Sequence, residues 1–337
     1  MKSAVQDHYG SPEVLEIRET APVTPARGEV LVRVHAAPVT QGDRRLRAAD
    51  FPGASAIIGR LMFGVFRPRN GTPGTNFAGR VVAVGEDVTK FAVGDDVFGS
   101  CDHGAYAEFV AVPEDGRVVR IPAGVDYDAA AASPYGAGTA LTFLRDLAKV
   151  QPGERVLIVG ASGGAGRYAV QVARHLGAEV TGVCSQRHAA MVKELGASEV
   201  IAHELEDYAK RGEIYDVVFD TTTGDDFERA RACLSERGRY VTLYMSGKAL
   251  RQMLWTSVFG GPRVTTGVAL GTQALLEDVA ALLADGSITP RVVARVPFAR
   301  IVEAHQQLER GNPGGDVIVA IDEVSKTISQ GPTLAAA

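Results

Sequence analysis

A short apolar run that passes into a glycine-rich turn constrains this chain more than any other segment. Residues 156–166 read VLIVGASGGAG, and a helical pattern follows at once. The run is typical of a buried strand, and a second strand-like run begins at residue 179, about 20 residues further on. Glycines let backbone approach a ligand and let a helix pack closely on a strand, so this order predicts a dinucleotide-binding unit. A purely structural strand-to-helix turn is the alternative.

The turn supplies the first candidate cofactor-binding residues. A helix beginning near Arg167 points its free N–H groups and its positive dipole end back toward the turn, where a diphosphate can bind. The candidate cofactor-binding residues of this turn are Gly160, Ser162, Gly163, Gly164, Ala165 and Gly166.

The end of the second strand indicates which nucleotide binds. NAD sites usually carry Asp or Glu there, to accept hydrogen bonds from the ribose hydroxyls. Residues 183–188 read VCSQRH and contain no carboxylate. Ser185 can donate to a 2′-phosphate and Arg187 can neutralise one, so the sequence favours NADPH. The alternative is that Arg187 is a solvated residue at the start of the next helix.

Composition excludes several classes of protein. The chain has 337 residues, 46% of them hydrophobic and 22% charged, with a formal net charge of −5. This balance suits a globular protein and predicts no nucleic-acid or anionic-membrane partner. No apolar run approaches the roughly 18 residues of a membrane span. The N-terminus has no signal-peptide pattern and the three cysteines are scattered, so we expect a cytoplasmic protein.

The chain changes character near residue 125. Before it, alternating β-branched runs with Gly and Pro turns predict a small β-barrel. After it, strands at 155–159, 179–183, 199–202, 216–220 and 239–243 alternate with helices, including one near 226–236. That alternation predicts a parallel sheet covered by helices. Residues 292–321 return to strand, helix and strand, and a polar tail at 325–337 is expected to be disordered.

Several ordered motifs resemble the medium-chain dehydrogenase/reductase superfamily, on its zinc-free quinone-oxidoreductase-like branch. They are PGTNFAG at 73–79, FAVGDDVFG at 91–99, GAYAE at 104–108, QPGERVL at 151–157 and LLADG at 282–286. The resemblance covers roughly residues 1–321 and implies an α/β fold with two domains. A GroES-like β-barrel would use residues 1–125 and 288–337, and a Rossmann doubly wound parallel sheet would use residues 126–287. The active-site cleft would lie between them.

The resemblance also implies a homodimer and bears on zinc. Relatives often dimerise by pairing edge strands, for which residues 263–268 are the candidate here. Zinc-dependent relatives place Cys and His where this chain has Thr40 and Thr75, and Thr replaces neither ligand. The adjacent residues Cys101, Asp102 and His103 are poorly spaced to share one ion, so we expect no metal.

Without zinc to activate an alcohol, reduction of an electrophilic acceptor is the expected reaction. A quinone or an α,β-unsaturated ketone or aldehyde accepts hydride readily, and the protein must orient it and donate a hydrogen bond to the developing oxyanion. Thr40 and Tyr135 are the catalytic candidates. The other pocket candidates are Gln41, Thr75 and Asn76 for the substrate and, by the resemblance, Thr139 for the nicotinamide side. Local turn stabilisation by Thr and Asn, and packing of the Tyr135 ring, are the alternatives.

Two apolar stretches, at residues 56–66 and 253–259, can wall a pocket for a bulky hydrophobic substrate or form an oligomer contact. Phe63 and Trp255 are their candidate substrate-binding residues, and core packing is the alternative.

One position departs from the pattern of the resemblance. Relatives commonly carry Gly-Lys before the last strand, whereas this chain has Gly315-Asp316, which puts the contact of that Lys in doubt. Two other functions stay open: an enoyl-thioester reductase of the same branch, with Arg60, Arg67 and Arg69 as a weak basic channel, and a non-catalytic NADPH-binding protein.

Overall fold

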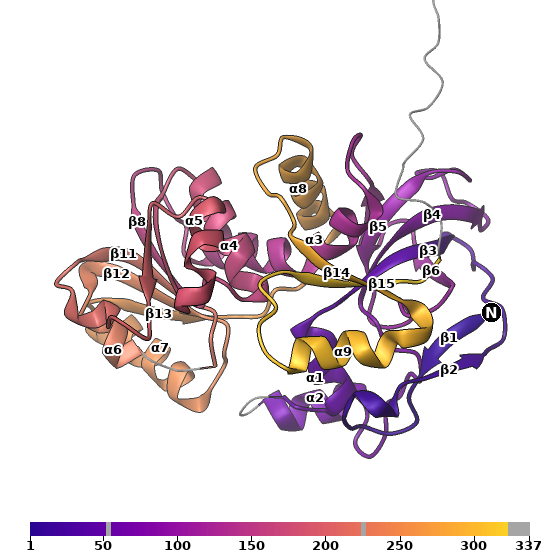
Figure 1. The fold of residues 1–337 in the computed structure, drawn as a ribbon, viewed down its shortest axis with the longest axis horizontal. Helices are drawn as coiled ribbons and strands as arrows, with labels where there is room; N and C mark the ends of the chain where they lie inside the picture. The colour runs from indigo at the N-terminus through magenta and orange to yellow at the C-terminus, as the bar shows by residue number, and fades with distance from the viewer. Residues whose placement is uncertain (52–54, 224–226, 323–337) are drawn as a thin grey trace, which may run out of the picture.

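A computed structural model of the chain describes residues 1–51, 55–223 and 227–322, which form two large β-sheets (Figure 1). A six-stranded sheet lies on the left of the view and a seven-stranded sheet on the right, with helix α3 between them. The predicted fold class, a barrel-type domain joined to a Rossmann-type parallel sheet, is confirmed. The expectation for the tail at 325–337 falls outside the described residues.

The six-stranded sheet is parallel throughout and has the order β10-β9-β8-β11-β12-β13. This is the doubly wound arrangement, in which the order reverses beside β8 and a crevice opens at the carboxyl ends of the strands. The strands are β8 (Arg155–Val159), β9 (Glu179–Cys184), β10 (Glu199–Ala202), β11 (Tyr215–Asp220), β12 (Leu234–Thr242) and β13 (Arg263–Thr266).

The helices of this half follow the predicted alternation, with one correction. The helix predicted near 226–236 is wrong in its second part, because β12 already begins at Leu234, which pairs with Tyr215 before a register shift in the ladder. Leu234 is buried, so strand pairing and burial override the polar sequence that follows it. The helical segments are α4 (Gly164–His175), η3 (Gln186–His188), α5 (Ala189–Glu194), η4 (Tyr208–Lys210), α6 (Phe227–Arg231), α7 (Gly247–Phe259) and α8 (Gln273–Ala284).

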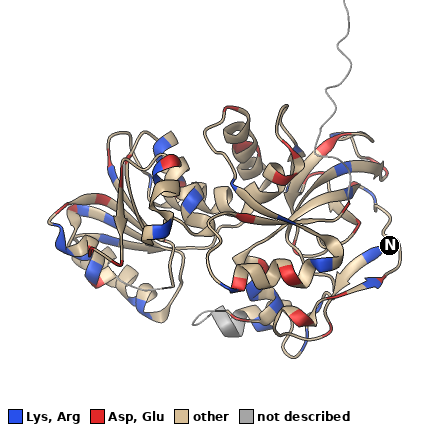
Figure 2. Cartoon of the chain, in the orientation of Figure 1, with Lys and Arg blue, Asp and Glu red and all other residues tan. Residues whose placement is uncertain are grey.

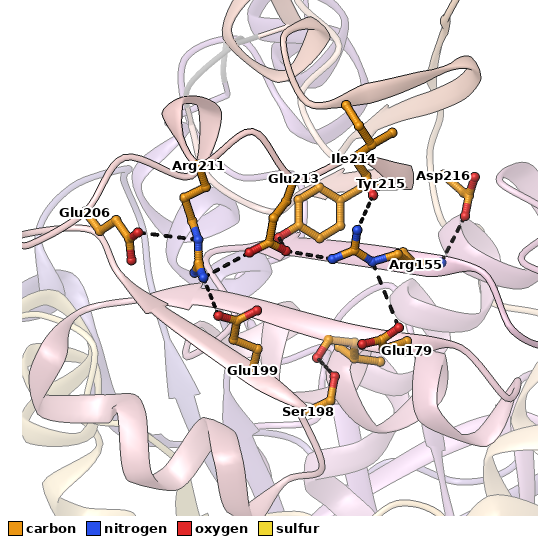
Figure 3. Close-up of polar contacts among 11 residues, drawn as sticks. Arg155, Glu179, Ser198, Glu199, Glu206, Arg211, Glu213, Ile214, Tyr215 and Asp216 are labelled. Carbon is orange, nitrogen blue, oxygen red and sulfur yellow. Dashed lines mark hydrogen bonds and ion pairs between the residues drawn. The ribbon is translucent and has the colours of Figure 1, made fainter.

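Ion pairs cover the amino ends of the central parallel strands (Figure 3). Arg155 opens β8 and pairs with Glu213, 2.6 Å away, while its backbone N–H donates to Asp216. Arg211 pairs with Glu213, Glu206 and Glu199, the last of which opens β10. The charged side chains at the amino ends of these strands therefore pair with one another.

The seven-stranded sheet has the order β14-β15-β3-β4-β5-β7, and β6 also pairs with β3. Strand β15 runs antiparallel to β3, with Val317 opposite Val39, so a strand from late in the chain completes a sheet begun near its start. The strands are β3 (Glu29–Val39), β4 (Asn76–Val84), β5 (Asp96–Ser100), β6 (Phe109–Pro113), β7 (Val118–Arg120), β14 (Val292–Pro297) and β15 (Asp316–Ala320).

Shorter elements surround this sheet. Strands β1 (Lys2–Val5) and β2 (Glu16–Glu19) form a separate antiparallel pair. The helical segments are η1 (Pro12–Val14), α1 (Gln41–Ala48), α2 (Ser55–Phe63), η5 (Phe298–Arg300) and α9 (Ile301–Glu309).

Helix α3 (Tyr127–Ala140), which continues as a π-helix over Leu141–Leu147, connects the two sheets. Its alanines share one hydrophobic core with Phe98 of β5 and Ile158 of β8. A Cβ on Gly136 would lie 2.2 Å from the Tyr168 ring, so α3 packs against α4 at a separation that only glycine permits. The two halves thus share a hydrophobic core and are not joined merely by linkers.

Acidic and basic residues alternate along the described ribbon in Figure 2, and neither sign is confined to one half of the molecule. Within the described residues, no helix is both long and apolar enough to span a bilayer.

Candidate functional site

The glycine-rich turn (residues 160–166) has the tight geometry that its sequence predicts. Gly160 adopts a φ of +81°, in the left-handed region that favours glycine. A Cβ on Gly166 would lie 2.1 Å from the Gly160 carbonyl oxygen, so α4 can approach β8 this closely only with glycine there. The turn therefore holds the start of α4 directly over the carboxyl end of β8.

The first turn of α4 presents free hydrogen-bond donors. Gly163 occupies the N-cap position and no side chain caps the helix. Among the described residues, the backbone N–H groups of Gly164, Ala165 and Gly166 have no acceptor, whereas that of Arg167 donates to the Gly163 carbonyl. Unpaired N–H groups at the positive end of a helix dipole fit a diphosphate, which has no side chain to displace here.

A cleft of about 750 Å³ begins at this turn. It lies at the carboxyl ends of β8, β9 and β11, where a doubly wound sheet binds its ligand. Its lining combines backbone of the turn with polar side chains, namely Val159, Gly160, Ser162, Val183, Cys184, Ser185, Arg187, His188, His203, Glu204, Tyr208, Asp220, Thr222, Arg229 and Asn312.

The predicted 2′-phosphate residues both line this cleft. Ser185 Oγ lies 3.1 Å from His188 Nδ1. The Arg187 side chain is exposed and has no ion pair or hydrogen bond within the described part of the chain. Burial, followed by the nearby Arg187, lowers the pKa of His188. The structure thus brings a hydroxyl, an imidazole and an unpaired guanidinium together at the end of β9.

The sequence reasoning missed Glu204 and His203, which follow β10. Glu204 Oε2 accepts a hydrogen bond from the Gln186 backbone N–H at 3.0 Å, and His203 Nδ1 lies 3.7 Å from the same carboxylate. Backbone hydrogen bonds lower the pKa of Glu204. A carboxylate therefore stands beside the end of β9 although none follows β9 in sequence. The parallel register of β9 and β10 was the available signal.

Asn312 was also missed, because it belongs to the seven-stranded half of the chain. Its amide nitrogen donates to Ser162, at 2.8 Å from the carbonyl oxygen and 2.9 Å from Oγ. The loop before β15 therefore covers the glycine-rich turn. Nothing in the local sequence around Asn312 indicates this contact.

A second polar cluster lies at the start of α1. Thr40 is the N-cap, and its backbone N–H and hydroxyl both donate to Asp43 Oδ2, at 3.0 and 2.6 Å. The Thr75 hydroxyl donates to Asp43 Oδ1 at 2.8 Å, and the Asn76 amide donates to Thr75 Oγ1 at 3.0 Å. Two predicted pocket residues therefore bond to one buried carboxylate, and a third is linked to it through Thr75. Burial raises the pKa of Asp43, opposed by the hydrogen bonds from Thr40 and Thr75.

The Tyr135 ring lies beside this cluster. A Cβ on Gly42 would lie 3.1 Å from Tyr135 Cε2 and 3.3 Å from Thr40 Oγ1, so the glycine leaves room for both side chains. Burial raises the pKa of Tyr135, which keeps its hydroxyl protonated. No hydrogen bond of that hydroxyl is found among the described residues. Tyr135 and Thr40, the two catalytic candidates, are thus neighbours.

Other predicted pocket residues have local partners. Gln41 Oε1 accepts a hydrogen bond from Arg44 Nε at 3.0 Å. The Thr139 hydroxyl donates to the Tyr135 carbonyl one helical turn earlier, at 2.6 Å. Both side chains are therefore held on their own helices.

The two apolar candidates lie elsewhere. Phe63 stacks on Phe51, with ring centroids 5.8 Å apart, on α2. Trp255 is 62% exposed and stacks on Phe259 on α7. Neither residue lines the 750 Å³ cleft. Their role in substrate binding stays a prediction.

The donor set around Thr40 and Thr75 does not fit zinc, which prefers thiolate, imidazole and carboxylate ligands. Within the residues that the structure describes, no three His, Cys, Asp or Glu side chains are grouped to hold a metal. Cys101 instead packs with its sulfur 3.7 Å from the Gly74 carbonyl, and burial raises the pKa of its thiol to about 12.

Known protein families match both halves of the chain. Residues 26–123 match the alcohol dehydrogenase GroES-like domain, and residues 195–319 match a family described as zinc-binding dehydrogenase. The mouse protein named NAD(P)H oxidoreductase RTN4IP1, mitochondrial, is 31% identical over 95% of this chain and 89% of its own length. A quinone oxidoreductase of Pseudomonas aeruginosa is 30% identical over 92% of this chain and 97% of its own.

A solved structure agrees with these likenesses. The quinone oxidoreductase of Coxiella burnetii superposes with a TM-score of 0.81 at 26% identity, covering 95% of this chain and 99% of that one. The fold and the likenesses together define the chain as an oxidoreductase. It belongs to the medium-chain dehydrogenase/reductase superfamily, on its quinone-oxidoreductase-like branch.

Proposed function

We propose that this protein is a zinc-independent, NADPH-dependent reductase of a quinone or an α,β-unsaturated ketone or aldehyde. One observation carries the proposal: within residues 1–51, 55–223 and 227–322, a turn with free N–H donors opens a cleft beside an unpaired guanidinium, and no zinc-type donor set accompanies it. The relatives named for quinone reduction and for NAD(P)H support the same class of reaction.

The choice of NADPH rests on Arg187. This side chain has no partner among the described residues, whereas the nearby Glu204 already accepts a hydrogen bond from Gln186. An unpaired arginine with the Ser185 hydroxyl beside it can bind a 2′-phosphate through charge-assisted hydrogen bonds. His203 Nδ1 lies 3.7 Å from the Glu204 carboxylate.

When bound, the nicotinamide supplies the hydride. The residues of the chain must then orient the acceptor and stabilise the negative charge that develops on its oxygen. Tyr135 is the proposed hydrogen-bond donor, because its hydroxyl is protonated and has no partner within the described residues. Thr40 already donates to Asp43, so its proposed part is to hold the start of α1 beside Tyr135, together with Thr75 and Asn76.

The proposal also includes a cellular compartment, an oligomeric state and contacts for the acceptor. Its cysteines are unpaired, which suits a reducing compartment such as the cytoplasm. Strand β13 pairs only with β12 among the described strands, and its free edge supports a homodimer formed by strand pairing. Phe63 and Trp255 remain the proposed contacts of a bulky hydrophobic acceptor.

The test follows oxidation of NADPH and NADH at the nicotinamide absorbance. Acceptors are a quinone, a 2-alkenal, a cyclic enone, an enoyl thioester and a simple aldehyde, each with and without chelator. We expect chelator-insensitive turnover with NADPH on a quinone or a conjugated carbonyl. Turnover with NADH alone, or turnover abolished by chelator, would overturn the nucleotide or the zinc part of the proposal.

Two variants test the roles proposed for Arg187 and Tyr135. Arg187→Ala should raise the KM for NADPH about tenfold and leave the KM for NADH unchanged, since it removes only the phosphate contact. Tyr135→Phe should lower kcat about tenfold with little change in the KM for NADPH. Tyr215→Phe is the matched control, because its hydroxyl donates to Glu213 at 3.2 Å at the amino end of β11, away from the candidate site. An unchanged kcat in Tyr135→Phe would remove Tyr135 from the mechanism.

A further inference from the structure

A buried ion pair joins the two halves of the molecule beside the glycine-rich turn. Arg167, in the first turn of α4, lies 2.7 Å from Asp316, the first residue of β15. Only 3% of the Arg167 side chain and 15% of the Asp316 side chain are exposed. One partner therefore comes from the nucleotide-binding half and the other from the barrel half. Asp316 is the residue that departs from the Gly-Lys pattern of the relatives.

The same pair is connected to the backbone of the turn. Arg167 Nη1 donates to the Ser162 carbonyl at 3.2 Å, and the Asn312 amide donates to that same oxygen. The Tyr168 hydroxyl lies 3.2 Å from the other carboxylate oxygen of Asp316. Ser162 is thus held from one side by α4 and from the other by the loop that leads into β15.

The charges make this arrangement sensitive to the loss of one partner. Buried opposite charges that are hydrogen-bonded compensate each other, whereas removal of one leaves an uncompensated charge in a poorly solvated site. If Arg167 is lost, the carboxylate of Asp316 remains close to the turn where an anionic diphosphate would bind. If Asp316 is lost, the remaining cation attracts the diphosphate but no longer ties the barrel to α4.

We propose that Ser162, Arg167, Asn312 and Asp316 form an interdomain clamp, in which a carboxylate of the barrel half positions the glycine-rich turn for the diphosphate. Arg167 and Asp316 are positioning residues in this proposal, which rests on the proposed binding of a nicotinamide nucleotide. Because linkage is reciprocal, nucleotide binding in turn strengthens the contact between α4 and β15.

The test is a double-mutant cycle on the full chain with Arg167→Met, Asp316→Asn and the double variant. Affinity for NADPH is measured by isothermal titration calorimetry, and folding by thermal unfolding without nucleotide. Arg167→Met should weaken NADPH binding about tenfold and Asp316→Asn about threefold, in the usual range of intersite coupling. The double variant, which has also lost the clamp, should bind NADPH about tenfold more weakly than the unaltered protein, and not about thirtyfold as two independent effects would give.

A matched pair on the opposite edge of the sheet separates positioning from mere stability. Arg155→Met with Glu213→Gln removes an ion pair of 2.6 Å that is remote from the turn. This control should lower the unfolding temperature and leave the affinity for NADPH unchanged.

The outcomes distinguish the clamp from the function on which it rests. If the unaltered protein binds neither NADPH nor NADH, the proposed function fails. If it binds NADPH but the cycle on Arg167 and Asp316 leaves the affinity unchanged, or shifts it no more than the control pair, the clamp is overturned. If Arg167→Met does not fold, the NADPH affinities of Asp316→Asn and the double variant test the clamp.

Discussion

The two ends of the strands in the six-stranded sheet differ in how their polar groups are satisfied. We call the amino ends of these strands the amino edge and the carboxyl ends the carboxyl edge. At the amino ends of β8, β10 and β11, arginines and glutamates pair with one another (Figure 3). At the carboxyl ends, backbone N–H groups of α4 have no acceptor in the described chain and Arg187 has no partner. The same parallel sheet thus has one edge that is complete in itself and one that is complete only with a ligand.

The charged groups at the amino edge therefore contribute to folding stability, whereas the polar groups at the carboxyl edge are available for ligand binding. Ion pairs at the amino edge are partly exposed, and such pairs contribute about 0–1 kcal/mol each. Donors at the carboxyl edge contribute nothing to the unliganded fold, but they are already oriented, so no reorganisation is needed when an anion arrives. Substitutions at the two edges should therefore change different measured quantities.

The strongest way to break the carboxyl edge is Gly166→Ala. The added Cβ would meet the Gly160 carbonyl oxygen at 2.1 Å and must displace α4 or the turn. We expect NADPH affinity to fall about a hundredfold, because small displacements of a binding geometry have effects of that size. Calorimetric titration measures it. Gly247→Ala is the control, since its Cβ would meet nothing within 4 Å. Equal affinities in both variants would contradict the close packing of the turn.

One source of acid sensitivity, His305, lies in the barrel half and away from both edges. This ring is buried, lies 2.9 Å from Arg47 Nη1 and packs edge-on against Tyr106. Burial, and then Arg47, lowers its pKa from 6.5 to about 3. Between these values the unfolded chain binds a proton that the folded chain does not, so stability falls as the pH drops below 6.5 and levels off below about 3.

At about pH 5 this histidine should cost about 2 kcal/mol of unfolding free energy relative to neutral pH. Urea unfolding at both pH values measures the difference, and His305→Gln should remove most of it. A variant that keeps the full acid sensitivity of the unaltered protein would place the titrating group elsewhere.

The amino edge should show the smallest effect. Arg211→Met removes the ion pairs with Glu199, Glu206 and Glu213 and should lower the unfolding free energy by about 1 kcal/mol. The loss should shrink as salt is raised, because exposed pairs are screened. NADPH affinity should not change. A change in affinity would mean that the two edges are coupled through the strands.

Local order explains which features the sequence predicted. Strand β10 occupies the predicted residues, and the glycine-rich turn has the predicted form, because strand, turn and helix are adjacent in the chain. The start of β12 was missed, because the residues after Leu234 are polar and Leu234 itself is paired with Tyr215 of β11, a distant residue in the sequence. Patterns within a short segment do not predict which distant strand the segment pairs with.

The same limit applies to the site. Ser185 and Arg187 follow β9 directly, whereas Glu204 reaches the same place from β10. Asn312 and Asp316 approach the turn from the other half of the molecule, so no spacing within residues 156–187 predicts them. The convergence of Thr40 and Thr75 on Asp43 likewise depends on the meeting of α1 with β4.

The pairing of β15 with β3 has a consequence for biosynthesis. As the chain leaves the ribosome, every strand of the parallel sheet is synthesised before β14 and β15, so that half can fold while the barrel still lacks these two strands. An open barrel edge at β3 during this interval is exposed to intermolecular pairing. Synthesis of β15 then closes that edge and delivers Asp316 to Arg167 in the same event. The final arrangement of the glycine-rich turn therefore waits for the synthesis of β15.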